Sequence, residues 1–581
     1  MKTLDLRGFT GITSSLMMTV VNNLRSNPDQ STSGEMAWEA GEFIDDFWRD
    51  PAPYRYSITS PRTQLTNIQL QGCSALTARS LHALLSSSPC VETLSLKGLP
   101  LVNNAICALI GNACSTNLVK LDLSRCTSMY ANGVEEMIGI NPSSSFRGFA
   151  GASRPRYPIP ARRFPKLKDL RLAGLKRVTG QTIFAIAWGV PKLEVLDVSG
   201  ARTLTDDDLD VFVRWDERFD DPHVLGSQVL RGPSNLAIEP YEFVTLTSRE
   251  MGYNPMSSEK YRRRLTRLRH LALSNCSLLT DAAAGNLAYS VPLLENLEMG
   301  GVGGALRDAG LLRLFATTRL IRRVDLEDAT DITDDVLHAL VPPPPLSHRH
   351  SLHHHSSLDV ATSSREPSPG EMLEEIVLSY AGNISDEAFL AVIRGCHRLR
   401  VLGIDNTRAS DTVVKEFVNT CRARQVLGAE VLAVDCRNVT RSAFIEGIGS
   451  RGSYLTRNRK GYRAWEARNL LYYDERDKKD PLSGVDVLTG PAAVGDECDE
   501  SRVVVKTFHS WQAVDSMTVA RERRRKTLLA KKALEEGRSK TPNSAGSDGS
   551  RTPRWLSWRS GTQTPVGGPD GLDLDRGCIT M

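Results

Sequence analysis

The chain has 581 residues and a net charge of +4, from 72 Lys and Arg against 68 Asp and Glu. Hydrophobic residues make up 40% of it and charged residues 24%, which is ordinary for a soluble protein. The N-terminus has no apolar signal core, and no run approaches the roughly 18 apolar residues that cross a membrane. The sequence therefore predicts no membrane-spanning helix.

A leucine pattern, L-x-x-L-x-L-x-x-C/A/L-x-x-L/I-T-D, recurs along most of the chain. Uninterrupted copies start 26 or 27 residues apart, a period typical of leucine-rich repeats. A first copy is under way at Leu4, and a looser last copy begins near Ala429. The clear copies start at Leu65, Val91, Leu118, Leu167, Leu193, Leu268, Leu294, Ile321, Leu373 and Leu399.

Each copy is predicted to form a short strand, a turn and a helix. In the copy at Leu193, alternating apolar residues indicate a strand, and Leu209 and Phe212 share the inner face of a helix. Thr205 and Asp206 supply the helix N-cap, as do the Thr-Asp or Ser-Asp pairs at 280–281, 333–334, 385–386 and 410–411. Because one copy cannot bury its own apolar side, the copies are expected to stack into an α/β solenoid. We predict a right-handed horseshoe of the ribonuclease-inhibitor type, with strands on the concave wall and helices outside.

The eleven cysteines include no C-x-x-C pair and do not suggest a disulfide framework. Cys73, Cys126 and Cys276 share one repeat position, three residues after the last strand leucine, where a small buried group is needed. Cys436 falls one residue early in a shortened copy. This usage is typical of a reducing compartment.

The cysteine-bearing copies with their T-D turn, from about Leu65 to Ile448, resemble the repeats of F-box/LRR proteins. That resemblance implies a substrate receptor of an SCF-type ubiquitin ligase, which docks on a Skp adaptor and cullin complex through its F-box. No F-box pattern precedes the repeats. Either an F-box lies upstream of Met1, or the chain is a fungal-type LRR protein of the ribonuclease-inhibitor subtype that has none.

The expected organisation has five parts. Residues 1–64 hold the first repeat and an insert that caps it, 65–448 the solenoid, 449–518 a C-terminal cap, 519–540 a basic helix and 541–581 a disordered tail. Long intervals between copies place inserts at about 142–164, 215–262 and 342–371, each after a helix and before a strand. All three inserts are therefore expected to emerge at the same edge of the horseshoe. They either form a binding face or are loops that lengthened because long surface insertions cost little stability. The histidine run at 348–355 has no companion ligands, so no metal or cofactor is predicted.

Residues between the strand leucines are expected to face the concave wall. In the two columns read from the sequence, seven acids outnumber two bases. Such a wall is predicted to attract a protein partner with a basic segment and to repel nucleic acid, while a polar face kept for solubility is the alternative. The seven acids are Asp122, Asp197, Glu298, Asp325, Glu327, Asp405 and Asp435.

The region after the repeats is basic. Residues 519–581 hold 13 Lys and Arg against 7 Asp and Glu. The basic cluster at 521–532 could direct nuclear import, bind nucleic acid or anionic lipid, or form only a solvated charged helix. Cys578 opens a C-a-a-X sequence that predicts prenylation, which together with the basic helix would give peripheral membrane contact. Thr541, Thr552 and Thr564 each precede Pro and are candidate phosphorylation sites.

Motifs of catalysis and nucleotide binding are missing: there is no P-loop, H-E-x-x-H or G-x-S-x-G, and the glycines at 300–304 lack the dinucleotide spacing. The sequence therefore predicts a non-enzymatic recognition protein of the cytoplasm, the nucleus or both. One reading is substrate recognition in SCF-type ubiquitin-dependent degradation. The other is an LRR scaffold or regulator without a ligase link, held at a membrane by a prenyl group.

Overall fold

The computed structural model describes residues 2–25, 62–140, 157–217, 242–253, 256–343, 367–440, 467–469, 503–506 and 526. The chain divides into two units, residues 1–514 and 515–581. Every strand and helix described below belongs to the first unit.

Fourteen short strands form one sheet in which every neighbouring pair is parallel. Their order is β1-β2-β3-β4-β5-β6-β9-β10-β11-β12-β13-β14-β16-β15. A separate antiparallel hairpin pairs β7 (Phe243–Thr247) with β8 (Lys260–Arg264). The sheet strands are β1 (Thr3–Asp5), β2 (Asn67–Gln69), β3 (Thr93–Ser95), β4 (Lys120–Asp122), β5 (Asp169–Arg171), β6 (Val195–Asp197), β9 (His270–Ala272), β10 (Asn296–Glu298), β11 (Arg323–Asp325), β12 (Glu375–Val377), β13 (Val401–Gly403), β14 (Glu430–Leu432), β15 (Ala467–Asn469) and β16 (Val503–Lys506).

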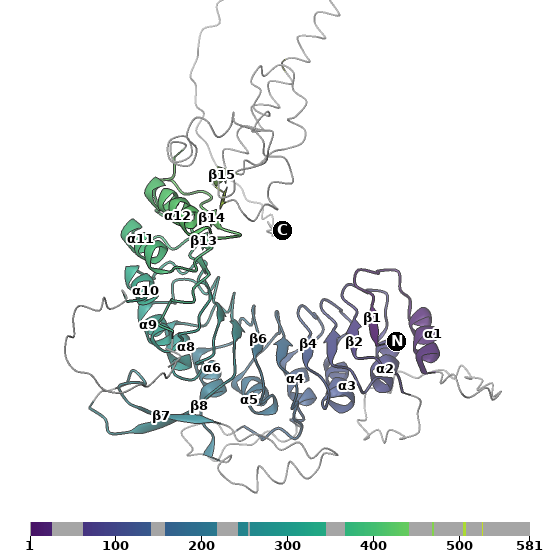
Figure 1. The fold of residues 1–581 in the computed structure, drawn as a ribbon. Coiled ribbons are helices and arrows are strands. Elements are labelled where there is room, and N and C mark those ends of the chain that lie inside the picture. Colours follow the sequence, from purple (N-terminus) through teal and green to yellow (C-terminus); the bar gives the residue numbers. More distant parts are fainter. Residues whose placement is uncertain are drawn as a thin grey trace, which may run out of the picture. The chain divides into compact units, whose positions relative to one another are not determined.

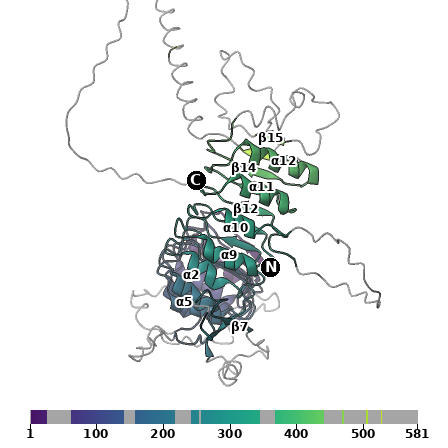
Figure 2. The same cartoon turned by 90° about the vertical axis from the view of Figure 1, so that its left-hand side faces the viewer.

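Helices cover one side of the sheet, so the unit has a strand layer and a helix layer (Figures 1 and 2). The middle residue of each three-residue strand from β1 to β14 in the sheet points into the core between the layers, as Leu121, Leu196 and Leu297 do at 1% exposure or less. The helices are α1 (Ser14–Arg25), α2 (Ala78–Ser87), α3 (Asn104–Cys114), α4 (Ala131–Met137), α5 (Gly180–Gly189), α6 (Asp206–Val213), α8 (Asp281–Leu287), α9 (Asp308–Thr317), α10 (Asp334–Ala339), α11 (Asp386–Gly395) and α12 (Asp411–Arg424). This is the predicted α/β leucine-rich-repeat solenoid. No described helix is long and apolar enough to cross a membrane.

The predicted N-caps are confirmed, and their aspartates have a second role. Thr280, Ser385 and the equivalent residues each accept a backbone N–H of their own helix on the side-chain oxygen. The Asp that follows a cap reaches forward to the cap of the next repeat. Asp334 accepts both the N–H of Ser385 at 2.7 Å and its hydroxyl at 2.6 Å. We call these contacts the aspartate clamps; they join Asp206 to Thr280, Asp308 to Thr333, Asp334 to Ser385, Asp386 to Ser410 and Asp411 to Thr440.

The repeat cysteines also connect neighbouring repeats. The thiol of Cys126 donates to the carbonyl of Leu96, and that of Cys276 to the carbonyl of Val198, each at the last core position of the preceding repeat's strand segment. Burial raises the pKa of Cys126 and of Cys276 to about 11, so both stay protonated and able to donate. The nine described cysteines are all free.

Part of the middle insert and the strand that follows it pack on the helix layer. Arg263 of β8 pairs with the buried Asp210 of α6 at 2.5 Å. The Arg264 guanidinium lies over the rings of Trp188 and Phe212, 5.4 and 4.9 Å from their centroids. The hairpin therefore covers α5 and α6 on the side away from the sheet face (Figure 1).

Candidate functional site

The solvent-facing side of the sheet, here called the strand wall, is where sequence analysis placed the binding acids. Strand pairing defines its centre column, which runs from Asp5 through Gln69, Ser95, Asp122, Arg171, Asp197, Ala272, Glu298, Asp325, Val377, Gly403 and Leu432 to Lys506. Asp122, Asp197, Glu298 and Asp325 stand in this column as predicted. Glu327 and Asp405 follow two residues after their column positions, also as predicted.

The wall position predicted for Asp435 is wrong. Gly403 pairs with Leu432, whereas the sequence had placed Ala433 in the centre column. Ala433 is 2% exposed and belongs to the core. Asp435 consequently lies in the turn after β14, in a left-handed backbone conformation with φ of 57°, and not on the wall column.

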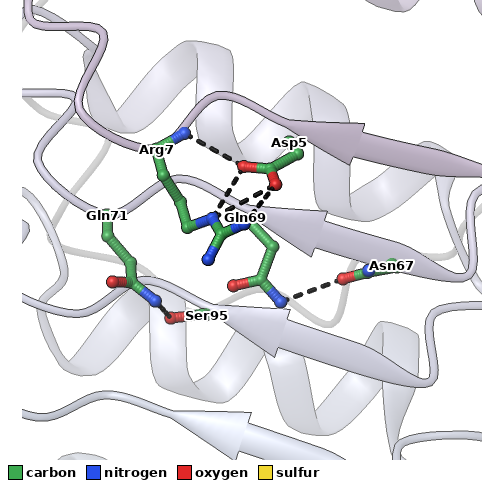
Figure 3. Close-up of polar contacts among 6 residues, drawn as sticks. All are labelled: Asp5, Arg7, Asn67, Gln69, Gln71 and Ser95. Atoms are coloured by element: carbon green, nitrogen blue, oxygen red, sulfur yellow. Dashed lines mark hydrogen bonds and ion pairs between the residues drawn. The ribbon is translucent and has the colours of Figure 1, made fainter. Parts of the chain in front are cut away.

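The first strands of the wall carry amide and hydroxyl groups that bind one another (Figure 3). Arg7 donates to both carboxylate oxygens of Asp5. The Gln69 amide donates to the Asn67 side chain at 3.0 Å, and the Gln71 amide donates to the Ser95 hydroxyl at 2.9 Å. Asp5 and Arg7 neutralise each other, and the Gln69 and Gln71 amides are satisfied within the wall, so these four residues offer little attraction to a charged partner.

The next acids flank a cation. Arg171 lies between Asp122 and Asp197 in the centre column and pairs with Asp169 at 3.0 Å. Its pKa is raised by the hydrogen bond to Asp169 and further by the two flanking carboxylates. Asp122 and Asp197 also accept the backbone N–H two residues on, each at 3.0 Å, which holds the strand-to-turn bend. Asp325 accepts the N–H of Glu327 in the same way, at 3.0 Å, so the neighbouring Arg171 is what distinguishes Asp122 and Asp197.

The acids of β10, β11 and β13 differ from those of β4 and β6. Glu298 binds His270 at 2.8 Å, and this hydrogen bond lowers the pKa of the Glu298 carboxyl. Burial raises the pKa of Asp325, of Glu327 and of Asp405, and neighbouring carboxylates raise all three further. A carboxylate that is destabilised by other carboxylates gains from an incoming cation.

A hollow of about 470 Å³ opens beside these acids. It spans the repeats of β9 to β12 and is lined by Ser274, Asn275, Gly300, Gly301, Asp325, Glu327, Asp328 and Tyr380. Three of the eight lining residues are acidic and none is basic. Tyr380 is 46% exposed and adds an aromatic surface, so the lining combines negative charge with a ring that can stack on a cation.

Two glycines make the hollow. A Cβ on Gly300 would lie 3.3 Å from an Asp325 carboxylate oxygen and 3.3 Å from Glu327. Gly301 has φ of 72°, and a Cβ there would lie 2.7 Å from the Asn275 side-chain oxygen. Sequence analysis considered these glycines only as a dinucleotide motif. The signal that could have found the hollow is a glycine in the column that elsewhere holds Ser, Lys or Glu.

The remaining predicted sites, Cys578, Thr541, Thr552 and Thr564, lie outside the described residues. The histidine run at 348–355, for which no metal was predicted, also lies outside them. Among the residues that the structure describes, no group of His, Cys, Asp and Glu is arranged to hold a metal ion.

No protein-family model matches the chain, and no curated protein matches it. Solved structures do. The chain is similar to a yeast Rad7 and Elc1 complex, with 16% identity over 60% of this chain and 83% of that one and a TM-score of 0.25. It is also similar to an internalin (inlF) from Listeria monocytogenes, with 12% identity over 65% of this chain and 76% of that one and a TM-score of 0.31. Similarity to the mouse RP105/MD-1 complex has 14% identity over 65% of this chain and 47% of that one, with a TM-score of 0.29. At these TM-scores the neighbours carry no argument about what this chain binds.

Proposed function

We propose that this protein is a recognition subunit that binds a basic segment of another protein on the acidic part of its strand wall. The observation that carries the proposal is the hollow of about 470 Å³ with Asp325, Glu327 and Asp328 in its lining and no basic residue among them. A Lys or Arg side chain that enters it relieves the repulsion between these carboxylates and gains charge-assisted hydrogen bonds. Tyr380 adds a stacking surface for a guanidinium.

We further propose that the bound protein is a target of SCF-type ubiquitin ligation. The support is the repeat type: the cysteine that follows the strand in several repeats and the Thr/Ser-Asp cap resemble the repeats of F-box/LRR receptors. Nothing in the wall itself depends on the ligase link, so the two parts of the proposal are tested separately.

Binding is tested by calorimetric titration with a Lys- and Arg-rich peptide. Replacing Asp325 with Asn and Glu327 with Gln removes two charged acceptors, each worth about 1.5–3 kcal/mol, and should weaken binding at least tenfold. The control is Asp122→Asn with Asp197→Asn, which removes the same charge beside Arg171. Equal effects of the two pairs would point to general charge attraction and contradict a site at the hollow.

Shape is tested without a change of charge. Gly300→Val narrows the hollow next to Asp325 and should lower affinity for the same peptide. Ala173→Val makes a similar enlargement at the equivalent wall position after β5, away from the hollow, and should leave affinity unchanged. Full affinity in Gly300→Val would show that the hollow is not the binding site.

The ligase link is tested by affinity purification of the full chain. Skp adaptor and cullin peptides among the captured proteins would support a receptor. Their absence, with a peptide-binding chain, would favour the alternative of a scaffold or regulator, and mass spectrometry of Cys578 would then show whether it carries a prenyl group.

A further inference from the structure

The turns that follow the strands carry opposite charges at the two sides of β9. Because the strands are parallel, all these turns lie at one edge of the sheet, which we call the turn edge. In sheet order β5 lies two strands before β9, and β11 lies two strands after it. The charges described next stand in the turns after β5 and β11.

The turn after β5 is basic. Lys176 and Arg177 are both exposed, and both lie against the ring of Tyr130, with Nζ 5.6 Å and Cζ 5.7 Å from its centroid. The turns at 97–103, 124–130, 173–179 and 199–205 contain no Asp or Glu. They do contain five exposed cations: Lys97, Arg125, Lys176, Arg177 and Arg202.

The turn after β11 is acidic. Glu327, Asp328 and Asp331 are all exposed, and only Asp331 of the three has a described ion pair, with Arg307 at 3.9 Å. This turn thus carries three carboxylates at the same distance from β9 as the Lys176 and Arg177 turn, on the opposite side.

The turn after β9 is neutral and exposes an apolar side chain. Leu278 is 53% exposed there. The neighbouring turn after β10 contains Gly300, Gly301, Gly303 and Gly304, which have no side chains to keep another surface away from Leu278. The charged residue at the end of this turn, Arg307, pairs with Asp331.

We propose that the turn edge binds a second copy of this chain, with a twofold axis at Leu278. Such an axis reverses the order of the turns, so Lys176 and Arg177 of each copy meet Asp328 and Asp331 of the other, and this contact forms twice. Leu278 meets its own counterpart on the axis. The proposal does not rest on the peptide-binding role of the strand wall.

The outer turns agree with the same axis. Tyr130 follows β4, three strands before β9, and Tyr380 follows β12, three strands after it; they are 40% and 46% exposed. A foreign partner would not require charges and aromatic rings to match at equal distances from one residue, whereas a self-complementary interface does.

The test is light scattering with size-exclusion chromatography on the full chain at low salt. We expect the wild type at twice the monomer mass. Lys176→Glu with Arg177→Asp should give monomers, and so should Asp328→Lys with Asp331→Lys, because each pair makes both contacts repulsive. An equimolar mixture of the two variants should regain the dimer mass, since every contact is then attractive again. A monomeric wild type, or a mixture that stays monomeric, overturns the proposal.

A second variant tests the axis alone. Leu278→Asp places two carboxylates against each other and should abolish the dimer. Leu427→Asp changes another exposed leucine, 56% exposed and beyond α12, and should leave the dimer intact. A dimer that survives Leu278→Asp would move the interface away from β9. Equal melting temperatures for all variants establish that loss of the dimer is not loss of the fold.

Discussion

The aspartate clamps show how one side chain serves two repeats. Asp334 sits in the first turn of α10, where a negative charge is favoured by the helix dipole. Its two carboxylate oxygens also take both donors of Ser385, the cap of α11. The clamp therefore fixes the distance between two helix starts, which apolar packing alone would leave less well defined.

Removing one clamp should destabilise the solenoid. Asp334→Ala leaves two donors of Ser385 without their acceptor, and we expect the free energy of unfolding to fall by about 1–2 kcal/mol. Asp335→Ala is the control, because it removes an exposed carboxylate from the same first turn and should change stability by less than about 0.5 kcal/mol. Urea unfolding followed by circular dichroism measures both. Equal losses would show that the charge, and not the clamp, matters.

Asp325 and Glu327 beside the hollow should lower the stability of the fold at neutral pH while they favour binding of a cationic peptide. The pKa values of Asp325 and Glu327 are raised in the fold above their ordinary 3.8 and 4.5, so the folded state holds these protons more tightly than the unfolded chain. Their contribution to stability consequently falls as pH rises through the raised values. Asp325→Asn with Glu327→Gln should be more stable than wild type at neutral pH, and this gain should vanish below about pH 3.5.

Thermal melts across this pH range test that prediction. The control pair, Asp122→Asn with Asp197→Asn, loses attraction to Arg171 and should gain no stability at neutral pH. Peptide affinity of the wild type should fall as pH is lowered through the same range, because a protonated carboxyl no longer attracts a cation. A neutral-pH melting temperature of the Asp325 and Glu327 variant at or below that of wild type would contradict the raised pKa values.

At the scale of elements, the hairpin β7–β8 is fastened to the helix layer by buried charge. Arg263 is 4% exposed and its partner Asp210 is 8% exposed. Asp210 also binds Arg214 on its own helix, so one carboxylate balances two guanidinium groups. A buried cation left without its carboxylate costs far more than an exposed one.

Asp210→Asn should detach the hairpin. We expect a loss of about 3–5 kcal/mol in the local stability of the hairpin, while repeats further along the sheet stay folded. Hydrogen exchange should then speed up at 243–264 and stay slow in α11 and α12. Asp207→Asn, an exposed acid of the same helix, should leave exchange unchanged. Faster exchange throughout the sheet would show that the hairpin supports the solenoid as a whole.

At the scale of the whole molecule, the periodic part of the fold follows from the sequence, because its causes are local. The leucine spacing placed the strands, and the Thr and Ser residues placed the caps. The contacts between repeats did not follow. The forward reach of Asp334 depends on Ser385, which stands 51 residues further along the chain, and no pattern within one repeat indicates it.

The error at Asp435 has the same origin. The last copy has lost one residue ahead of its strand: Leu399 precedes the core residue Leu402 by three positions, whereas Ala429 precedes Val431 by two. Counting from the first apolar residue therefore shifts the wall column to Ala433. Only pairing between strands shows the change. The hollow was missed because it depends on Gly300 lying beside Asp325 and Glu327 of the next repeat, a relation across strands.

The buried thiols allow local opening of individual repeats to be measured by chemical labelling. A protonated, enclosed sulfur does not react with an alkylating reagent until its repeat opens, so each modified cysteine marks one opening event at a known place. Cys73 and Cys436 are nearer the ends of the sheet and should label before Cys276 at its middle, since an inner repeat is held on both sides. The exposed Cys90 supplies the unprotected rate. Labelling by iodoacetamide, mapped by mass spectrometry, would give this order directly, and first modification at Cys276 would place the weakest point of the array at its centre.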